Sequence, residues 1–366
     1  MAIPSNSHLE LGKLGAGLMQ WGTTAIDEKV VNPKGNLTEE EVRNIWKTCR
    51  DRQIVFFDTA EGYGGGTSEM RVRSVKKWYE DSALDGKSED AVVIATKFLP
   101  TLWRWTKHSF YKSLNGSLDR LGVDCIDLYF IHTPIHPLPL EYFIQWACDA
   151  VDDGLIKHIG ISNCNADLTR RAAAVAKQNG KKIECNQIML NMLVWNSAPH
   201  QETVRTCHEL GIQIVAYSPI GQGLLTDSLT ESKFSSIRAV KMTGVKYPDI
   251  QPLRERIEKI SKERACTMAQ VAINWVRGHG AVPLVGCRSV QQVEDAAGST
   301  GWDLTKDEIE GLDKLSLGLS LFERPLYRRG LFVVFISLLQ LAYYTEQKYK
   351  RFQKILFPAR SGSHDE

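Results

Sequence analysis

The stretch IVFFDTAEGYGGGTSE, residues 54–69, decides the fold because a short apolar run leads into a glycine-rich loop. Residues 54–57 are β-branched or aromatic, a composition that favours a strand, and Asp58 follows them. Similar runs recur along the chain, and helical patterns lie between them. These further runs cover residues 13–19, 91–97, 126–132, 156–162, 183–187, 212–217 and 281–286. Such alternation is typical of βα units around a parallel sheet.

Eight such units that close on themselves form a (β/α)₈ TIM barrel of the α/β class, and this is the simplest architecture for the pattern. Nearly continuous apolar strands need helices over their outer face. Thr38 and Glu41 form a predicted capping box, and Asn165 and Thr267 are further expected N-caps. An open doubly wound sheet is the alternative. Against it, no GxGxxG follows the first strand, and the nearest glycine run, residues 62–66, follows the second.

Residues 218–252 form a long stretch rich in Gly, Ser and Thr. Loops of this length inside a compact domain usually have a function. We therefore predict a mobile cover over a ligand, with a tolerated surface insertion as the alternative.

The bulk composition is that of a globular protein that needs no covalent or metal support. Of the 366 residues, 43% are hydrophobic and 24% are charged, which permits a large buried core. The cysteines form no CxxC pair and no cluster with histidine at metal-ligand spacing, so we expect reduced thiols and no metal site. They are Cys49, Cys125, Cys148, Cys164, Cys185, Cys207, Cys266 and Cys287.

A change of composition divides the chain into a barrel domain, residues 1–322, and a basic and apolar tail, residues 323–366. Residues 323–360 hold eight basic and two acidic side chains, which leaves a slight negative charge on residues 1–322 and predicts no nucleic-acid binding. Residues 331–344, LFVVFISLLQLAYY, would form a helix of about 21 Å, too short to cross a bilayer. We expect a C-terminal helical extension that lies on an anionic membrane surface. Packing against the barrel or a protein partner is the alternative.

The first residues, MAIPSNSHLELGKLG, show no basic region followed by an apolar one. No secretory signal is therefore predicted. We expect a cytoplasmic protein, with membrane association or a protein contact through residues 323–360.

Four polar residues lie where a parallel barrel places its active site, at or just after the carboxyl ends of strands. Asp58 ends the second predicted strand and Tyr63 follows it, Lys97 ends the third, and His132 ends the fourth. Each residue alone has a structural explanation, such as a helix cap, a solvated strand end or a packing aromatic. Four together on three successive strand ends favour catalysis.

This set can deliver a proton beside a hydride acceptor. A carbonyl that takes hydride on carbon develops negative charge on oxygen, which must be protonated or stabilised. A phenol is a weak acid, with an ordinary pKa of about 10. We expect the Lys97 ammonium to lower the pKa of Tyr63, Asp58 to hold that ammonium, and His132 to orient the substrate oxygen.

Seven motifs together make the chain resemble the aldo-keto reductase family over residues 12–316, in family order. These motifs are FFDTAEGYGGGTSE (56–69), IATK (94–97), DLYFIH (127–132), IGISNC (159–164), NQ (186–187), YSPIGQGLLT (217–226) and PLVGCRSVQQVEDA (283–296). The resemblance implies a barrel that binds NADPH or NADP⁺ without a Rossmann domain. It implies that Tyr63 donates the proton, assisted by Asp58, Lys97 and His132.

The resemblance also implies the cofactor contacts. Ser162, Asn163 and Gln187 resemble the residues that bind the nicotinamide carboxamide, and Tyr217 resembles the residue that stacks on the ring. A guanidinium suits a dianionic phosphate, which favours NADPH over NADH. The remaining implied contacts are Trp21, Gly22, Ser218, Gly223, Leu225 and Gly286, with Arg288 and Ser289 at the adenosine 2′-phosphate and Gln292 and Asp295 near the adenine.

The last motif departs from the family pattern, which follows its glutamine with a Glu-Asn pair. This chain has Gln292, Asp295 and Ala296. Asp295 can replace the acid, but Ala296 cannot make the amide contact, so the NADP preference is less secure than the catalytic assignment.

Four tryptophans are expected in loops at the barrel mouth, namely Trp21, Trp103, Trp105 and Trp195. Core packing is the alternative for each of them. Together with a likeness to plant-type reductases of pyridoxal-like aldehydes, they predict a preference for bulky or aromatic aldehydes as the small-molecule carbonyl substrate.

Two other functions fit parts of the sequence. Potassium-channel β-subunits share the barrel and act largely in complexes, and a basic, apolar tail would suit such a binding module. A barrel aldolase would form a Schiff base on Lys97. The presence of Tyr63, Asp58 and His132 beside this lysine argues against that function.

Overall fold

Eight short strands close into a barrel in which each strand pairs in parallel with the next one along the chain, and β8 pairs with β1. The computed structural model describes residues 9–22, 36–82, 92–235, 240 and 244–319. The strands are β1 (Gly15–Gly17), β2 (Phe56–Asp58), β3 (Val93–Phe98), β4 (Ile126–Ile131), β5 (Ile156–Ser162), β6 (Ile183–Met189), β7 (Gln213–Tyr217) and β8 (Val282–Gly286). All eight predicted strands and the (β/α)₈ fold class are confirmed.

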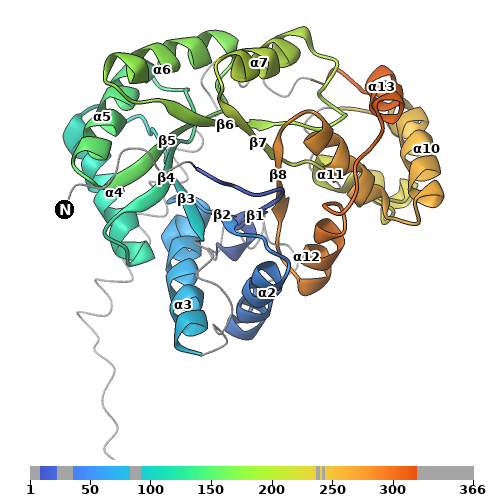
Figure 1. The fold of residues 1–366 in the computed structure, drawn as a ribbon, viewed down its shortest axis with the longest axis horizontal. Helices are drawn as coiled ribbons and strands as arrows, with labels where there is room; N and C mark the ends of the chain where they lie inside the picture. Colours follow the sequence, from blue (N-terminus) through green and yellow to red (C-terminus); the bar gives the residue numbers. More distant parts are fainter. Residues whose placement is uncertain (1–8, 23–35, 83–91, 236–239, 241–243, 320–366) are drawn as a thin grey trace, which may run out of the picture.

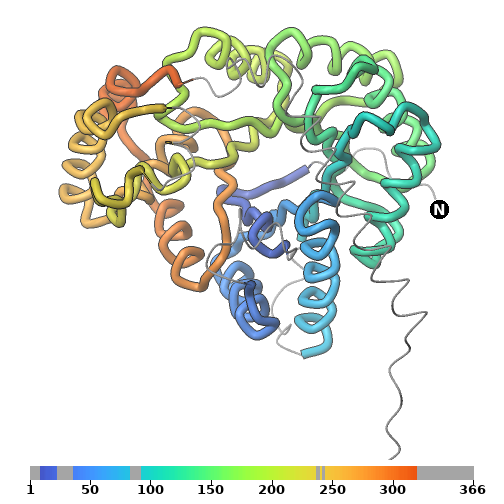
Figure 2. Tube along the Cα trace, turned by 180° about the vertical axis from the view of Figure 1, so that it is seen from behind, coloured from blue at the N-terminus to red at the C-terminus, as the bar shows by residue number. Residues whose placement is uncertain are grey.

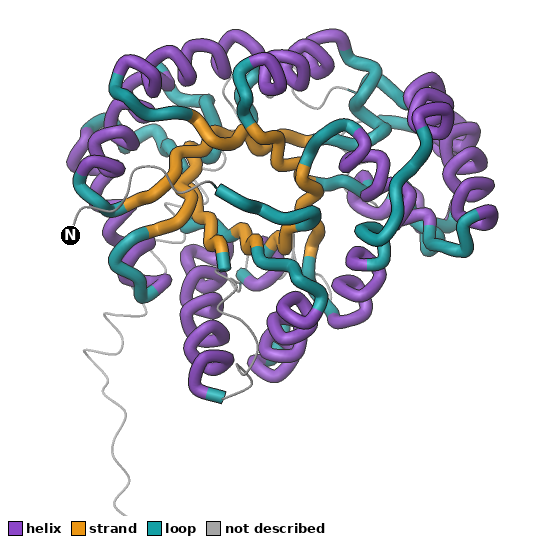
Figure 3. Tube along the Cα trace, in the orientation of Figure 1, coloured by secondary structure: helices purple, strands orange, loops and turns teal. Residues whose placement is uncertain are grey.

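Helices surround this ring of strands on its outer face (Figure 3). Those that follow strands β2 to β6 are α3 (Thr67–Asp81), α4 (Lys107–Leu121), α5 (Leu140–Asp152), α6 (Ala166–Gln178) and α7 (Ala198–Glu209). The others are α2 (Glu39–Asp51), α8 (Glu231–Phe234), α10 (Tyr247–Glu263), α11 (Met268–Gly278), α12 (Val290–Ala297) and α13 (Lys306–Leu315). Helices α10 and α13 lie side by side on one flank of the barrel (Figures 1 and 2).

The predicted helix starts are confirmed. Thr38 and Glu41 form a reciprocal capping box at α2, and Thr267 begins α11 with another capping box. Asn165 accepts a hydrogen bond from the Leu168 N–H at the start of α6. Each cap satisfies a backbone N–H that has no partner within its helix.

Large side chains fill the barrel interior. Glycines on neighbouring strands leave the space that these side chains occupy. A Cβ at Gly160 would lie 2.4 Å from the Phe130 ring, and one at Gly15 would lie 2.5 Å from the Phe56 ring. The segment before β1 crosses the barrel in Figure 1 and adds Leu11 to this inner cluster. The closed, packed interior gives the residues at the carboxyl ends of the strands a rigid support.

The described parts of the segment after β7 hold more regular structure than the predicted long loop. They include the 3₁₀ turn η3 (Gly221–Gly223) and the short helix α8, and α10 begins at Tyr247, before the expected end of the loop at residue 252. The side chains of Leu224, Leu225 and Phe234 are buried. These described parts therefore pack against the barrel through the apolar side chains that lie between their polar residues.

The predicted tail and its apolar stretch, together with the domain boundary at residues 322 and 323, lie outside the described residues. No helix in the described ranges has the length and apolar content needed to span a membrane. Within these ranges all the cysteines are free thiols, and most are buried.

Candidate active site

The structure brings the four predicted catalytic residues together at the carboxyl ends of β2, β3 and β4. Asp58 is the last residue of β2, and Lys97 lies in β3. Tyr63 begins the 3₁₀ turn η2 (Tyr63–Gly66), and His132 directly follows β4. Parallel neighbours in register place these ends on the same rim of the barrel.

The Lys97 side chain, which is fully buried, is held at the centre of the cluster by three acceptors. Its Nζ lies 2.5 Å from Asp58 Oδ2, 2.7 Å from the Thr59 carbonyl oxygen and 3.2 Å from Tyr63 Oη. A lysine ammonium has three donors and no acceptor, so all of its donors are used. Tyr63 Oη must accept in this contact, which leaves the phenol proton free for another acceptor.

Burial opposes charge on every member of this cluster. It raises the pKa of Asp58 and lowers that of Lys97, and in each case the charge of the partner opposes the shift. Burial, and after it the charge of Asp58, raises the pKa of Tyr63 well above its ordinary value. This direction is opposite to the expected lowering, because burial disfavours the charged phenolate. Tyr63 is protonated at neutral pH, as a proton donor must be.

His132 faces Tyr63 as a neutral imidazole. The two ring centroids lie 5.9 Å apart with an interplanar angle of 81°. Burial and the charge of Lys97 lower the pKa of His132 to about 3. Its Nδ1 is buried and has no hydrogen-bond partner among the described residues. A neutral ring can donate from one nitrogen and accept at the other, which suits contact with a substrate oxygen.

The predicted nicotinamide residues form one hydrogen-bonded chain on the neighbouring strands. Asn163 Nδ2 donates to the His132 carbonyl oxygen and to Ser162 Oγ, each at 3.0 Å. Tyr217 Oη donates to Asn163 Oδ1 at 2.9 Å, and Gln187 Nε2 donates to Asp58 Oδ1 at 2.9 Å. This chain links the amides directly to the catalytic cluster.

These residues fit a carboxamide ligand. Gln187 bonds Asp58 through its Nε2, which leaves Oε1 as its acceptor, and Asn163 Oδ1 accepts from Tyr217 and keeps one lone pair. Both oxygens can accept from an amide NH₂. Asn163 adopts a left-handed backbone conformation, with φ of 60°, which few non-glycine side chains other than Asn and Asp adopt readily.

The predicted phosphate-binding residues cluster at the start of α12 and in the turn after β7. Ser289 caps α12 by accepting from the Gln292 N–H, and Gln292 Oε1 accepts from the Arg288 N–H at 3.0 Å. A helix N-terminus with an arginine beside it suits a phosphate group. Ser218 and Gly223 both have positive φ, at 54° and 97°. Gly286 is exposed at the end of β8.

Three predicted cofactor contacts, Leu225, Asp295 and Gly22, make contacts within the protein that the sequence does not predict. The Leu225 side chain is fully buried in the core, and its N–H bonds to the Ile220 carbonyl oxygen. Asp295 Oδ1 accepts from Thr267 Oγ1 at 2.8 Å and from Gln270 Nε2 at 3.1 Å, so one carboxylate oxygen already fixes the start of α11. A Cβ at Gly22 would lie 2.5 Å from the Gly64 nitrogen, so Gly22 supports the turn that carries Tyr63.

Two of the four tryptophans do not line the mouth, which corrects the sequence interpretation. Trp21 is fully buried, and its Nε1 donates to the Cys287 carbonyl oxygen at 2.9 Å. Trp195 packs on Trp275 and His279, with centroids 5.6 Å and 4.2 Å away. His279 caps the C-terminal end of α11 just before β8, which is the end of the barrel opposite the catalytic rim. Packing against other buried groups, and not the barrel mouth, therefore sets the positions of the Trp21 and Trp195 side chains.

The other two tryptophans agree with the expectation. Trp103 and Trp105 lie in the loop after β3 and are 48% and 47% exposed. This loop follows the strand end that carries Lys97, so both indoles lie on the catalytic side of the barrel.

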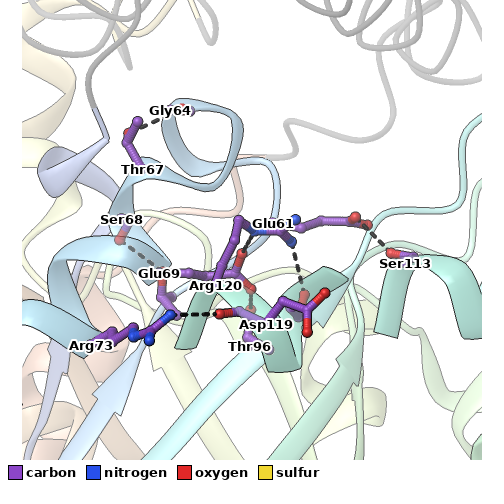
Figure 4. A network of polar contacts seen from close by, with 12 residues as sticks. Glu61, Gly64, Thr67, Ser68, Glu69, Arg73, Thr96, Ser113, Asp119 and Arg120 are labelled. Atoms are coloured by element: carbon purple, nitrogen blue, oxygen red, sulfur yellow. Dashed lines mark hydrogen bonds and ion pairs between the residues drawn. The ribbon is translucent and has the colours of Figure 1, made fainter. Parts of the chain in front are cut away.

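Sequence reasoning missed a set of acidic residues that supports the catalytic turn. Glu69 Oε1 accepts from Thr96 Oγ1 at 2.6 Å and Glu69 Oε2 from Arg120 Nε at 2.5 Å. Figure 4 shows these contacts beside the Glu61–Ser113 bond. Glu61 and Glu69 both belong to the motif at residues 56–69, so the sequence contained a signal for them. Their hydrogen-bond partners come from later elements, which the sequence alone does not place beside them.

Comparison with known proteins places the chain among carbonyl-reducing enzymes. The Aldo/keto reductase family model matches residues 13–317. The pyridoxal reductase of Arabidopsis thaliana, described as chloroplastic, is 31% identical over 305 residues, which cover 82% of this chain and 83% of that protein. Aldo-keto reductase str7 of Strobilurus tenacellus is 30% identical over 290 residues, which cover 76% of this chain and 82% of that protein.

Solved structures agree with this fold. A thermostable aldo-keto reductase, Tm1743, in complex with the inhibitor epalrestat, has a TM-score of 0.63 and 25% identity, over 85% of this chain and 98% of that one. The aldose reductase from Schistosoma japonicum has a TM-score of 0.65 at 20% identity, over 87% and 93% of the two chains, which shows the shared barrel. Barrel and relatives together define an oxidoreductase. The chain belongs to the aldo/keto reductase family.

Proposed function

We propose that this enzyme reduces aldehydes and ketones to alcohols with NADPH, and that Tyr63 donates the proton to the carbonyl oxygen. The observation that carries the proposal is the contact between Lys97 Nζ and Tyr63 Oη, at 3.2 Å. Because lysine can only donate there, the phenol proton is available to a ligand in the mouth of the barrel.

The proton transfer needs both the burial and the lysine. Burial keeps Tyr63 protonated until a substrate oxygen gains negative charge. When the proton leaves, the adjacent ammonium of Lys97 stabilises the phenolate, and Asp58 fixes that ammonium through the 2.5 Å contact. Solvent then returns a proton to the phenolate oxygen. Neutral His132 lies beside Tyr63 and orients the substrate oxygen.

NADPH supplies the hydride when it is bound. We propose that Asn163 and Gln187 accept from the carboxamide of its nicotinamide ring, and that Tyr217 stacks on that ring. The N-terminus of α12, with Arg288 and Ser289, would bind the 2′-phosphate. These contacts would hold the cofactor near Tyr63 and leave the proton chemistry to the protein.

The test is the Tyr63→Phe variant, which keeps the ring and removes the proton. We expect kcat/KM for a panel of aldehydes to fall by roughly 10² to 10⁴, the usual contribution of a general acid. NADPH affinity, measured by fluorescence titration, should stay unchanged. Equal rates for the variant and the wild type would remove Tyr63 from the mechanism.

The two alternative functions have less support. A binding subunit of low turnover would show no aldehyde-dependent loss of NADPH absorbance in the wild type. An aldolase would need a free Lys97 amine, but the three contacts of Nζ hold it as a donor. Trapping with borohydride should therefore attach no carbonyl substrate to Lys97.

We also propose a cytoplasmic location, with contact between residues 323–360 and an anionic membrane. The support is the sequence, which places basic residues on both sides of the apolar stretch at 331–344. Deletion of residues 323–366 should reduce the membrane-bound share in cell fractions. An unchanged share would reject the membrane contact.

A further inference from the structure

A buried ion pair joins the catalytic turn to the loop that carries the exposed tryptophans. Glu61 lies two residues before Tyr63, and Arg104 lies between Trp103 and Trp105. The guanidinium donates to the carboxylate with two nitrogens, Nη1 to Oε1 and Nη2 to Oε2, the second at 3.1 Å. The side chains are 7% and 19% exposed, so the pair is shielded from solvent. Such bidentate geometry fixes orientation as well as distance.

The Glu61 carboxylate accepts further hydrogen bonds, and it thereby connects three elements. The Leu99 N–H donates to Glu61 Oε1 at 2.7 Å, at the start of the tryptophan loop. Ser113 Oγ of α4 donates to Glu61 Oε2 at 2.6 Å (Figure 4). Burial would raise the pKa of Glu61, but Arg104 together with these donors lowers it, so Glu61 stays charged. Arg104 Nη1 also donates to the Leu99 carbonyl oxygen at 2.9 Å, which closes the loop on itself.

The loop held in this way carries the exposed side chains of Trp103 and Trp105, and Trp105 packs on His136; we call these three rings the aromatic wall. The Trp105 ring meets the His136 ring edge-on, with centroids 4.8 Å apart. His136 comes from the loop after β4, and its Nε2 lies 3.1 Å from the Thr101 carbonyl oxygen of the tryptophan loop. Both strands that carry Lys97 and His132 at their ends thus contribute a ring to this wall.

We propose that Glu61 and Arg104 determine specificity as positioning residues, by fixing the Trp103–Trp105 wall relative to the Tyr63 hydroxyl so that planar aromatic aldehydes are favoured. The proposal rests on the proposed reductase function and names its substrate class. A flat ring gains contact area and stacking from a fixed indole, whereas a short alkyl aldehyde reaches Tyr63 without it. A rigid wall also avoids the entropy cost of ordering the loop at each binding event.

The test compares Arg104→Lys, which keeps the charge and loses the planar fork, with the wild type on 4-nitrobenzaldehyde and propanal. We expect kcat/KM for 4-nitrobenzaldehyde to fall by about tenfold or more, mainly through KM, because wall contacts bind rather than react. The value for propanal should change by less than about twofold. Arg264→Lys is the matched control, since Arg264 pairs with Glu308 through two nitrogens at 3.0 Å and 2.5 Å outside the site. Equal losses for both aldehydes, or no loss for either, would overturn the proposal.

A double-mutant cycle with Trp105→Ala tests whether Arg104 acts through the wall. If it does, Arg104→Lys adds no further loss for 4-nitrobenzaldehyde once Trp105 is gone. Additive losses would mean that Arg104 acts elsewhere. Glu61→Gln, which keeps the size and part of the hydrogen bonding, replaces Arg104→Lys if that variant does not fold, and the same outcomes decide.

Binding separates this inference from the proposed function. Quenching of tryptophan fluorescence by 4-nitrobenzaldehyde gives Kd without any turnover. A wild type that binds this aldehyde but oxidises no NADPH would refute the proposed function, while the ratio of Kd values between Arg104→Lys and wild type would still decide the inference. We expect that ratio to be about tenfold, and a ratio near one would refute the role of the clamp.

Discussion

The mouth of the barrel has two halves that are built on different principles. The half formed by β2, β3 and β4 is held by buried charges, with the pair of Asp58 and Lys97 at its centre and that of Glu61 and Arg104 behind it. The half formed by β5 to β8 is held by neutral amides and hydroxyls and by backbone in the left-handed region. Its non-glycine residues with positive φ are Asn163, Ser218 and Gln222.

The difference matches two chemical tasks. Proton donation to a developing oxyanion is helped by buried charges, because electrostatic interactions are stronger where little solvent surrounds them. A neutral ring and its carboxamide are recognised by fixed donors and acceptors, and left-handed residues aim such groups at the cost of local backbone strain. In the proposed mechanism, acid–base work and cofactor recognition would thus be separated around a single rim.

The largest expected effect comes from removing the charge in the first half. Lys97→Met leaves Asp58 as an uncompensated buried carboxylate, so we expect about 3 to 5 kcal/mol lower stability by denaturant unfolding. Loss of the ammonium beside Tyr63 should also reduce kcat by roughly 10² to 10⁴. The matched variant, Lys97→Met combined with Asp58→Asn, should recover much of the stability and none of the activity. Retention of a tenth or more of kcat in Lys97→Met would show that the charge is not needed.

The second effect lies in the recognition half and concerns the cofactor. Arg288→Gln removes a guanidinium beside the N-terminus of α12, and hydrogen bonds to charged groups contribute about 1.5 to 3 kcal/mol. We expect kcat/KM for NADPH to fall by roughly tenfold to a hundredfold, and that for NADH to stay within about twofold. Lys314→Gln, beside Gly278 and His279 at the opposite end of the barrel, is the control for net charge. Parallel losses with both cofactors would show that Arg288 does not bind a 2′-phosphate.

The smallest effect is a flat pH profile. Because the pKa of His132 is lowered to about 3, the imidazole stays neutral through the ordinary range, and kcat/KM should show no titration near pH 6.5. The folded pKa lies below the unfolded value, so the stability contributed by neutral His132 is complete above about pH 6.5. It is lost as the pH falls toward about 3, since the unfolded chain binds the proton first. Chemical shifts of the His132 ring in a pH titration measure this directly, and a midpoint near 6.5 would contradict the burial argument.

The sequence predicted the barrel well because its signals are local. Strand runs and the caps at Thr38, Asn165 and Thr267 depend on neighbours within a few residues, and the structure confirms them. The cluster of Asp58, Tyr63, Lys97 and His132 was also found, because the carboxyl ends of parallel strands meet on one rim.

The errors arose where distant contacts decide. Trp21 and Trp195 follow strands as mouth residues do, yet one is enclosed beside Cys287 and the other packs on α11. The direction of the Tyr63 pKa was wrong because desolvation depends on the atoms that surround the phenol, and these come from the whole rim. The partner of Glu61 could not be seen because Arg104 is separated from it by a strand and a helix.

By itself, the sequence determined the order of strands and helices, the family, and which polar residues end the strands, because periodicity, capping and motifs act over short distances along the chain. The tertiary structure decided which of these atoms meet, which way their pKa values move, and which tryptophans are buried or exposed. Burial and long-range contact create those properties, and both exist only after the barrel has closed.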